Sequence, residues 1–268
     1  MFDLTGELGE TPLRLTQADA CRRLRLPPIL SACSTEVVAA GRFTVSKLSS
    51  NRTRVICLEG PSAVGKTTLA AELARTAGVV IVSELDPSGA PAVAESAHWF
   101  VDRHASQWQR ARALAPGAPL VVLDGDPFKG LWYNWVYAAD GWPRVDVVAP
   151  LYRSHLAQGT VDFPDLYVVL AASEAQLQQR RANDLTRTRR TFERHLRLVG
   201  PLQRYFAALA AADPERVLVL DTGAPDALAA EVLASLERLP RGEPSSERLL
   251  EIMVAWVGAH DPGRESPL

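Results

Sequence analysis

The sequence is short of cysteine and of long apolar runs. Its three cysteines, Cys21, Cys33 and Cys57, are spaced neither as metal ligands nor as a redox pair. We interpret them as reduced thiols, which is typical of a cytoplasmic protein. No apolar run approaches the ~18 residues that a membrane span requires. Residues 1–7 lack the basic and apolar regions of a secretory signal. We therefore expect a cytoplasmic protein with no membrane partner.

A large excess of charge of either sign is also missing. The chain of 268 residues has 29 Lys and Arg against 31 Asp and Glu, so its formal net charge is −2. This balance gives no electrostatic case for nucleic acid as the main partner. Hydrophobic residues make up 47% and charged residues 22%, which is normal for a globular protein. The sequence leaves the oligomeric state open between a monomer and a homodimer.

Short apolar strands alternate with helical patterns from residue 54 onward. This alternation predicts an α/β fold with a five-stranded parallel sheet that is flanked by helices on both faces. We expect an N-terminal extension over residues 1–53, the main domain over 54–239, and a linker with a short helix over 240–268. The predicted strands are 54–59, 79–82, 120–124, 166–170 and 217–221. The predicted helices are 68–74, 92–114, 130–139, 145–157, 174–181, 191–212, 226–239 and 247–257, with one short helix over 17–26 in the extension.

The most specific pattern is G-x-x-x-x-G-K-[ST] at residues 60–67, between the first predicted strand and the next helix. This is the context that a phosphate-binding P-loop requires. Lys66 is one of only three lysines in a chain with 26 arginines. We expect Lys66 to reach the β- and γ-phosphates of ATP and the Thr67 hydroxyl to ligate Mg²⁺. The residues expected to hold the nucleotide are Gly60, Ser62, Ala63, Val64, Gly65, Lys66, Thr67 and Thr68.

Carboxylates follow two of the predicted strands. Asp124 ends an apolar strand, in the position of a Walker-B acid, and Asp126 comes two residues later. One of the two is expected to hold the metal and the other to take the proton of an acceptor hydroxyl, and the sequence does not assign the roles. Asp126 also suits a plain turn before Pro127. Glu84 follows the second strand and is either an acceptor ligand or part of a polar turn.

An arginine-rich stretch, residues 179–190, separates two predicted helices. Guanidinium groups bind phosphate oxygens in a bidentate manner, so the stretch is expected to form a lid over the triphosphate. Arg180 is the candidate for binding ATP and Arg187 for stabilising the charge that develops during transfer. The alternative is an ordinary solvated basic face.

Aromatic residues gather around the predicted acceptor side. Phe100 belongs to a predicted helix, and Trp132 and Tyr133 follow the carboxylates. These three either wall a pocket for a flat or nonpolar acceptor or simply pack in the core. The histidines are dispersed without metal spacing, and we assign them no role.

Taken in order, these segments resemble the thymidylate kinase and deoxynucleoside kinase branch of the P-loop kinases, over about residues 54–239. The resemblance implies the P-loop NTPase fold with an arginine-rich lid, and it implies that Arg103 orients the acceptor. Gly125 stands where this branch has an arginine that helps to bind the acceptor. This departure favours a neutral hydroxyl over a nucleoside monophosphate.

The sequence therefore predicts an ATP- and Mg²⁺-dependent kinase that phosphorylates a nucleoside-like or antibiotic-like small molecule. Lys66, Asp124, Asp126 and Arg187 are the expected catalytic residues, with Thr67 and Asp124 at the metal. Three alternatives stay open: a nucleoside monophosphate kinase, a P-loop ATPase or GTPase that acts as a switch or assembly factor, and a nucleotide-binding regulator without turnover.

Overall fold

The computed structural model describes residues 53–76, 78–84, 88–184, 192–239 and 245–262. The chain divides into two compact units after Val38, and all of the described residues belong to the second unit. The predicted extension over residues 1–53 lies outside the described residues, apart from Thr53. Within the described ranges, every helix is too short or too polar to cross a bilayer.

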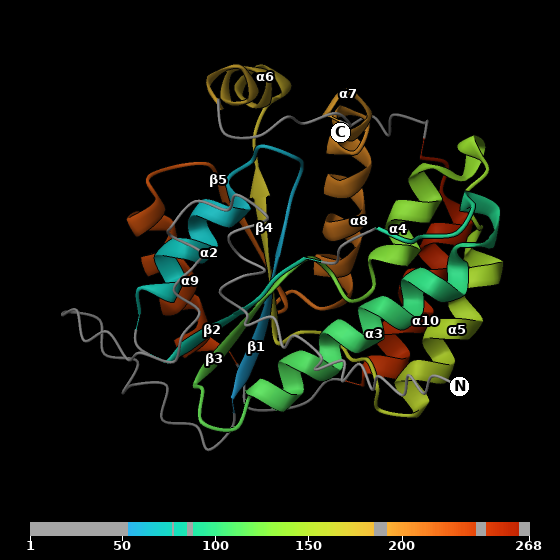
Figure 1. The fold of residues 1–268 in the computed structure, drawn as a ribbon, viewed down its shortest axis with the longest axis horizontal. Coiled ribbons are helices and arrows are strands. Elements are labelled where there is room, and N and C mark those ends of the chain that lie inside the picture. The colour runs from blue at the N-terminus through green and yellow to red at the C-terminus, as the bar shows by residue number, and fades with distance from the viewer. Residues whose placement is uncertain (1–52, 77, 85–87, 185–191, 240–244, 263–268) are drawn as a thin grey trace, which may run out of the picture. The chain divides into compact units, whose positions relative to one another are not determined.

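Five parallel strands form one sheet in the order β2-β3-β1-β4-β5 (Figure 1). All five predicted strands are confirmed, and β4 extends one residue further than predicted. The central strand β1 pairs with β3 on one side and with β4 on the other, so Ile56 lies between Val122 and Leu166. The strands are β1 (Arg54–Glu59), β2 (Val79–Val82), β3 (Leu120–Asp124), β4 (Leu166–Ala171) and β5 (Val217–Asp221).

Helices cover both faces of the sheet, as predicted (Figure 1). One face is covered by α2 (Lys66–Ala74) and α9 (Pro225–Arg238). The other face carries α3 (Ala97–Leu114), α4 (Lys129–Val136), α5 (Val145–Ala157), α8 (Val199–Ala212) and α10 (Ser246–Ala259). The remaining helices are α6 (Glu174–Asn183), α7 (Phe192–Leu196) and two 3₁₀ turns, η3 (Val93–Glu95) and η4 (Ala138–Asp140).

The alternation of side chains along β1 explains the two layers. Val55 and Cys57 are buried against the α3–α4–α5–α8–α10 side, whereas Ile56 and Leu58 are buried against the α2–α9 side. A strand that is buried on both faces reads as a continuous apolar run, which is the pattern of residues 55–58.

Three predicted helices are interrupted. The one predicted over 130–139 divides into α4, which ends at Val136, and η4. Residues 191–212 were expected to form one helix, but α7 ends at Leu196 and α8 begins at Val199. Pro201 accounts for the break, because its ring and missing N–H are tolerated only in the first turn of a helix. Similarly, the helix predicted over 92–114 begins at Ala97, after η3.

The C-terminal helix α10 packs against α4, α5 and α8. Its apolar face is buried in the same core as those helices, through Leu249, Leu250, Met253 and Val257. The helix predicted over 247–257 is therefore part of the layer that covers the sheet.

Candidate active site

The phosphate-binding loop lies between β1 and α2. Gly65 is the N-cap of α2 and Lys66 is its first residue, so the backbone N–H groups of the first helical turn point toward the loop. The Lys66 ammonium donates to the carbonyl oxygen of Gly60 over 2.6 Å. It is thereby held at the centre of the loop, where the motif predicts it.

Glycine is required at position 60 because the loop passes close to β4. Its φ is +141°, and a Cβ there would lie 2.6 Å from the carbonyl oxygen of Leu170. A side chain would therefore push the loop away from β4 and would also be strained by the positive φ. The tight start of the loop follows from this close approach.

Arg180 reaches the loop from α6. Its guanidinium donates to the carbonyl oxygen of Val64 over 2.6 Å, so it lies beside the expected nucleotide phosphates. Its role in binding ATP stays a prediction. Arg187, the other lid arginine with a predicted role, lies outside the described residues.

Glu59, the last residue of β1, brings a carboxylate into the base of the site. Its side chain is 1% exposed. One carboxylate oxygen accepts the backbone N–H of Asp126 over 2.8 Å, and the other accepts that of Gly60 over 3.1 Å. This carboxylate therefore ties the phosphate loop to the loop after β3.

Lys129, the first residue of α4, lies between two carboxylates. Its ammonium is 3.0 Å from a carboxylate oxygen of Glu84 and 3.8 Å from one of Glu59. Burial favours the neutral amine, but the two carboxylates outweigh it and raise the Lys129 pKa. The Lys129 charge in turn is the main reason that the pKa of Glu84 falls to about 2. Both groups are thus held in their charged forms.

Asp124 combines burial with an unused oxygen. Its Oδ1 is buried and has no hydrogen-bond partner among the described residues. Burial raises the Asp124 pKa; the Lys66 charge opposes this, and Glu84 and Glu59 add to it. A buried carboxylate oxygen without a partner beside a phosphate loop suits either a cation or a proton that is being transferred.

The residues present fit Mg²⁺ in the way that P-loop enzymes use it. Among the described residues, no three His, Cys, Asp or Glu side chains form a metal cluster. Phosphate-bound Mg²⁺ does not need one, because one or two protein oxygens plus the phosphates and waters complete its shell. The orphaned Oδ1 of Asp124 and the hydroxyl of Thr67, in the first turn of α2, are donors of that type.

Asp126 faces the core rather than the site. It is 0% exposed. Its Oδ1 accepts from the backbone N–H of Phe128 and from the hydroxyl of Tyr167, both over 2.8 Å, and its Oδ2 accepts from the indole of Trp132 over 3.0 Å. Burial, followed by the charge of Glu59, raises its pKa to about 7. A carboxylate with three internal donors is placed to fix the loop after β3, which does not suit the predicted contact with an acceptor or metal.

Two of the three predicted aromatic residues lie together at the surface of the site. Phe100 and Tyr133 are half-buried, and their rings are 5.8 and 5.1 Å from that of Trp142. Trp132, in contrast, is 1% exposed and is engaged with Asp126. Its placement is that of a core residue, so the prediction that it walls the acceptor pocket does not fit the structure.

Two arginines flank these rings. Arg103 is exposed and lies over the ring of Trp99 at 4.6 Å. Arg194 lies over the rings of Tyr137 and Trp142 at 4.2 and 5.3 Å. Each cation thus faces an aromatic ring, an arrangement that stabilises a charge without a carboxylate.

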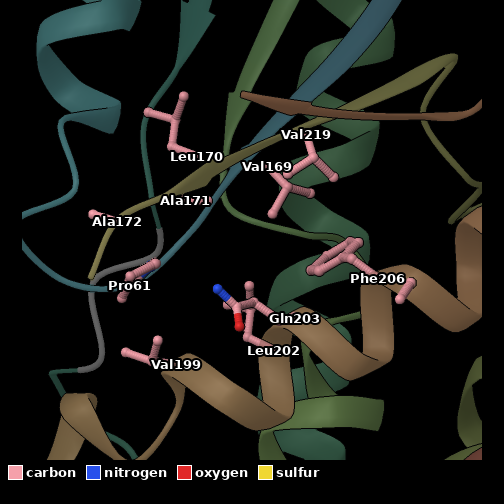
Figure 2. A pocket seen from close by; sticks show the side chains of 11 residues that line it. Pro61, Val169, Leu170, Ala171, Ala172, Val199, Leu202, Gln203, Phe206 and Val219 are labelled. Atoms are coloured by element: carbon pink, nitrogen blue, oxygen red, sulfur yellow. The ribbon is translucent and has the colours of Figure 1, made fainter. Parts of the chain in front are cut away.

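A small apolar pocket lies where the phosphate loop, β4 and β5 meet α8 (Figure 2). It has a volume of about 160 Å³, which is below the ~300–1,000 Å³ of typical small-molecule sites. Figure 2 shows Pro61 of the loop at one end and Gln203 and Phe206 of α8 across from β4 and β5. The predicted acceptor residues do not line it.

Sequence reasoning assigned no role to Glu59, Lys129, Trp142 and His195. His195 is half-buried, and burial and the nearby Lys129 and Lys66 charges lower its pKa. One signal for Lys129 was present in the composition. The chain has only three lysines, and both of those within the described residues lie at this site.

Comparisons with known proteins identify the fold. No family model matches the sequence, and no curated protein matches it. The structure of deoxyadenosine kinase from M. mycoides with bound dATP is similar, at 13% identity and a TM-score of 0.51 over 68% of this chain and 98% of that one. The structure of the same kinase with the products dCMP and dCDP has 13% identity and a TM-score of 0.49, over 69% of this chain and 99% of that one. The structure of thymidylate kinase from Candida albicans has 15% identity and a TM-score of 0.42, over 71% of this chain and 93% of that one.

At such low identity the first likeness shows a shared fold and no more. Together with the parallel sheet and the loop after β1, it confirms the P-loop kinase fold that the sequence predicts. Of the arginine-rich stretch predicted over residues 179–190, residues 185–190 lie outside the described residues.

Proposed function

We propose that this chain is an ATP-dependent kinase that transfers the γ-phosphate to a hydroxyl group of a nucleoside-like or antibiotic-like small molecule. One observation carries the proposal: the phosphate loop with Lys66 lies beside Asp124, whose buried Oδ1 has no partner among the described residues. The fold shared with a deoxyadenosine kinase supports the same class of reaction.

Phosphoryl transfer requires mostly positioning and neutralisation of charge. Lys66 and the N-terminus of α2 hold the phosphates, and Arg180 adds a cation at the loop. When bound, Mg²⁺ would screen the phosphate charge, with Thr67 and Asp124 as the protein donors. Asp124 alternatively accepts the proton of the acceptor hydroxyl, a role for which a raised pKa is suited.

The charges around the acceptor side favour a neutral acceptor. Glu59, Glu84 and Asp124 place three carboxylates there. The ammonium of Lys129 already faces two of them, and that of Lys66 is held by the phosphate loop. A monophosphate would bring two further negative charges into this region. A hydroxyl acceptor brings none, and the half-buried rings of Phe100 and Tyr133 offer it a flat apolar surface.

The test is a screen for ATP consumption with the product mass measured. The probes are 2′-deoxyadenosine, thymidine, dTMP, chloramphenicol and streptomycin. A gain of one phosphate on an unphosphorylated probe supports the proposal. A diphosphate product from dTMP alone would indicate a monophosphate kinase instead, and ATP loss without any acceptor would indicate an ATPase.

Replacement of Lys66 tests the assigned site. Lys66→Ala should abolish transfer while circular dichroism shows the helix content unchanged, because the hydrogen bonds of the ammonium within the described part of the chain go to two loop carbonyls. The matched control is Arg153→Met, which removes a cation from an exposed ion pair with Glu251, between α5 and α10. The control should retain full activity. Wild-type rates in Lys66→Ala would contradict the assignment.

A further inference from the structure

The backbone of the loop after β3 disfavours an ordinary side chain at Gly125. Its φ is +113°, a conformation that L side chains rarely adopt. A Cβ at this position would point at Glu84, with 3.8 Å to its Cγ. An arginine at position 125, as the kinases that this chain resembles have it, would be strained, and its stem would meet Glu84.

Lys129 lies against the same glutamate, with its ammonium 3.0 Å from a carboxylate oxygen of Glu84. Its side chain is 22% exposed, so it is largely sheltered from solvent. From α4, its ammonium faces Glu84, which follows β2, and Glu59, the last residue of β1. The same nitrogen lies 5.8 Å from the ring centre of Trp132. Three separate segments therefore fix the position of one cation.

The ammonium keeps a donor for a ligand. A lysine ammonium has three N–H donors, and the contact to Glu84 at 3.0 Å is a hydrogen bond, whereas Glu59 at 3.8 Å gives only an ion pair. Tyr133, one of the rings at the acceptor side, lies one turn further along α4. The free donor and the aromatic surface thus belong to the same face of α4.

We propose that Lys129 binds the acceptor, donating a hydrogen bond to an oxygen of the acceptor molecule while Glu59 and Glu84 hold the ammonium in place. The inference rests on the proposed function. In this interpretation Lys129, on α4, supplies the positive charge that an arginine at position 125 would otherwise supply. Because the two carboxylates raise the Lys129 pKa, the group stays charged through the pH range of any assay.

A purely structural role for Lys129 makes a different prediction. If the ammonium only neutralised the carboxylates, its loss would loosen the loops around ATP and the acceptor alike. If it binds the acceptor, the loss should appear in the KM of the acceptor and not in that of ATP. The comparison of these two constants therefore separates the two roles.

The experiment compares Lys129→Met with the wild type and with the control Arg153→Met. The acceptor is the one of the five probes that the wild type phosphorylates fastest. We expect the KM of this acceptor to rise about 10- to 100-fold, the range for the loss of a hydrogen bond to a charged group. The KM of ATP should stay within about twofold of the wild type. If Lys129→Met does not fold, Lys129→Gln, which keeps an N–H donor for Glu84, serves the same test.

Two results would overturn the inference; one leaves the proposed function intact, and the other removes it as well. An unchanged acceptor KM, or equal increases in both constants, in a variant of an active wild type would remove the role of Lys129 and leave the proposed function intact. A wild type that phosphorylates none of the probes would remove the proposed function, and the role of Lys129 with it.

Discussion

The two aspartates after β3 should respond in opposite ways to the same substitution. Asp124 has a buried oxygen without a partner, whereas Asp126 has three internal donors. Asparagine replaces one carboxylate oxygen by an NH₂ group, which donates and cannot accept. The substitution therefore tests which carboxylate serves the chemistry and which serves the fold.

The cost at Asp126 follows from its donors. If the NH₂ group takes the place of Oδ2, it faces the indole N–H of Trp132; if it takes the place of Oδ1, it faces the backbone N–H of Phe128. Neither donor can turn into an acceptor, so one buried N–H is left unsatisfied in either orientation. Asp126→Asn should thus lower the free energy of unfolding by about 1–3 kcal/mol.

Substitution of Asp124 by asparagine should lower the activity and not the stability. Its Oδ1 has no donor to lose, and removing a buried charge also removes a desolvation penalty. We expect Asp124→Asn to be at least as stable as the wild type, while kcat/KM falls by about 100-fold or more, whether the carboxylate is a base or a metal ligand.

Urea denaturation and steady-state kinetics on the two variants measure both quantities. The expected pattern is a stable, inactive Asp124→Asn and a destabilised Asp126→Asn that retains activity when folded. A stable but inactive Asp126→Asn, beside a fully active Asp124→Asn, would refute the reasoning and return the catalytic role to Asp126.

Two further predictions concern the stability of the fold. Gly60→Ala should cost on the order of 2–5 kcal/mol, because its Cβ would lie 2.6 Å from the carbonyl oxygen of Leu170 at a positive φ; unchanged thermal unfolding would show that the loop can move away from β4. Acidification should destabilise the protein through buried His104, whose pKa is lowered to about 3 by burial and by the Lys129 charge. Since the unfolded chain protonates this histidine below ~6.5 and the folded chain does not, stability is complete above that value and is lost as the pH falls. From about pH 7 to about pH 5 the loss is about 2 kcal/mol. The raised pKa of Asp126 acts in the opposite direction over the same range in both proteins. Urea unfolding should therefore show the His104 loss as the difference in pH dependence between the wild type and His104→Asn, which keeps a polar group for Tyr152; the same pH dependence in both proteins would contradict it.

The strands were predictable because all five are short apolar runs, and the three central ones, β1, β3 and β4, are buried on both faces. A continuous apolar run bounded by turn residues has few other readings, and β1, β2, β3 and β5 have the predicted bounds. Helix ends were less predictable, since the helical pattern of residues 191–212 continues across Pro201. There the backbone restriction of a single proline outweighs the periodicity of the side chains around it.

The site was predictable only where one segment supplies the chemistry. The phosphate loop is contiguous, so its spacing alone indicates its function. The Glu59–Lys129–Glu84 cluster joins residues that are up to 70 positions apart and depends on how β1, β2 and α4 meet. Asp126 shows the converse: its position after a strand is that of a catalytic acid, but the side chains of Trp132 and Tyr167 turn it into the core.

The order of the strands separates the two sides of the site. Because β1 lies between β3 and β4, the phosphate loop stands where the connections from the central strand diverge, which is where ligands bind in open parallel sheets (Figure 1). Charged groups follow β2 and β3, namely Glu84, Asp124 and Lys129. At the carboxyl end of β4 and beside β5, the pocket of Figure 2 is lined almost wholly by apolar side chains. If the proposed function holds, the reacting end of the acceptor lies on the charged β2–β3 side. We therefore expect the loss of Lys129, and not of a group near β5, to weaken binding of the acceptor without weakening that of ATP.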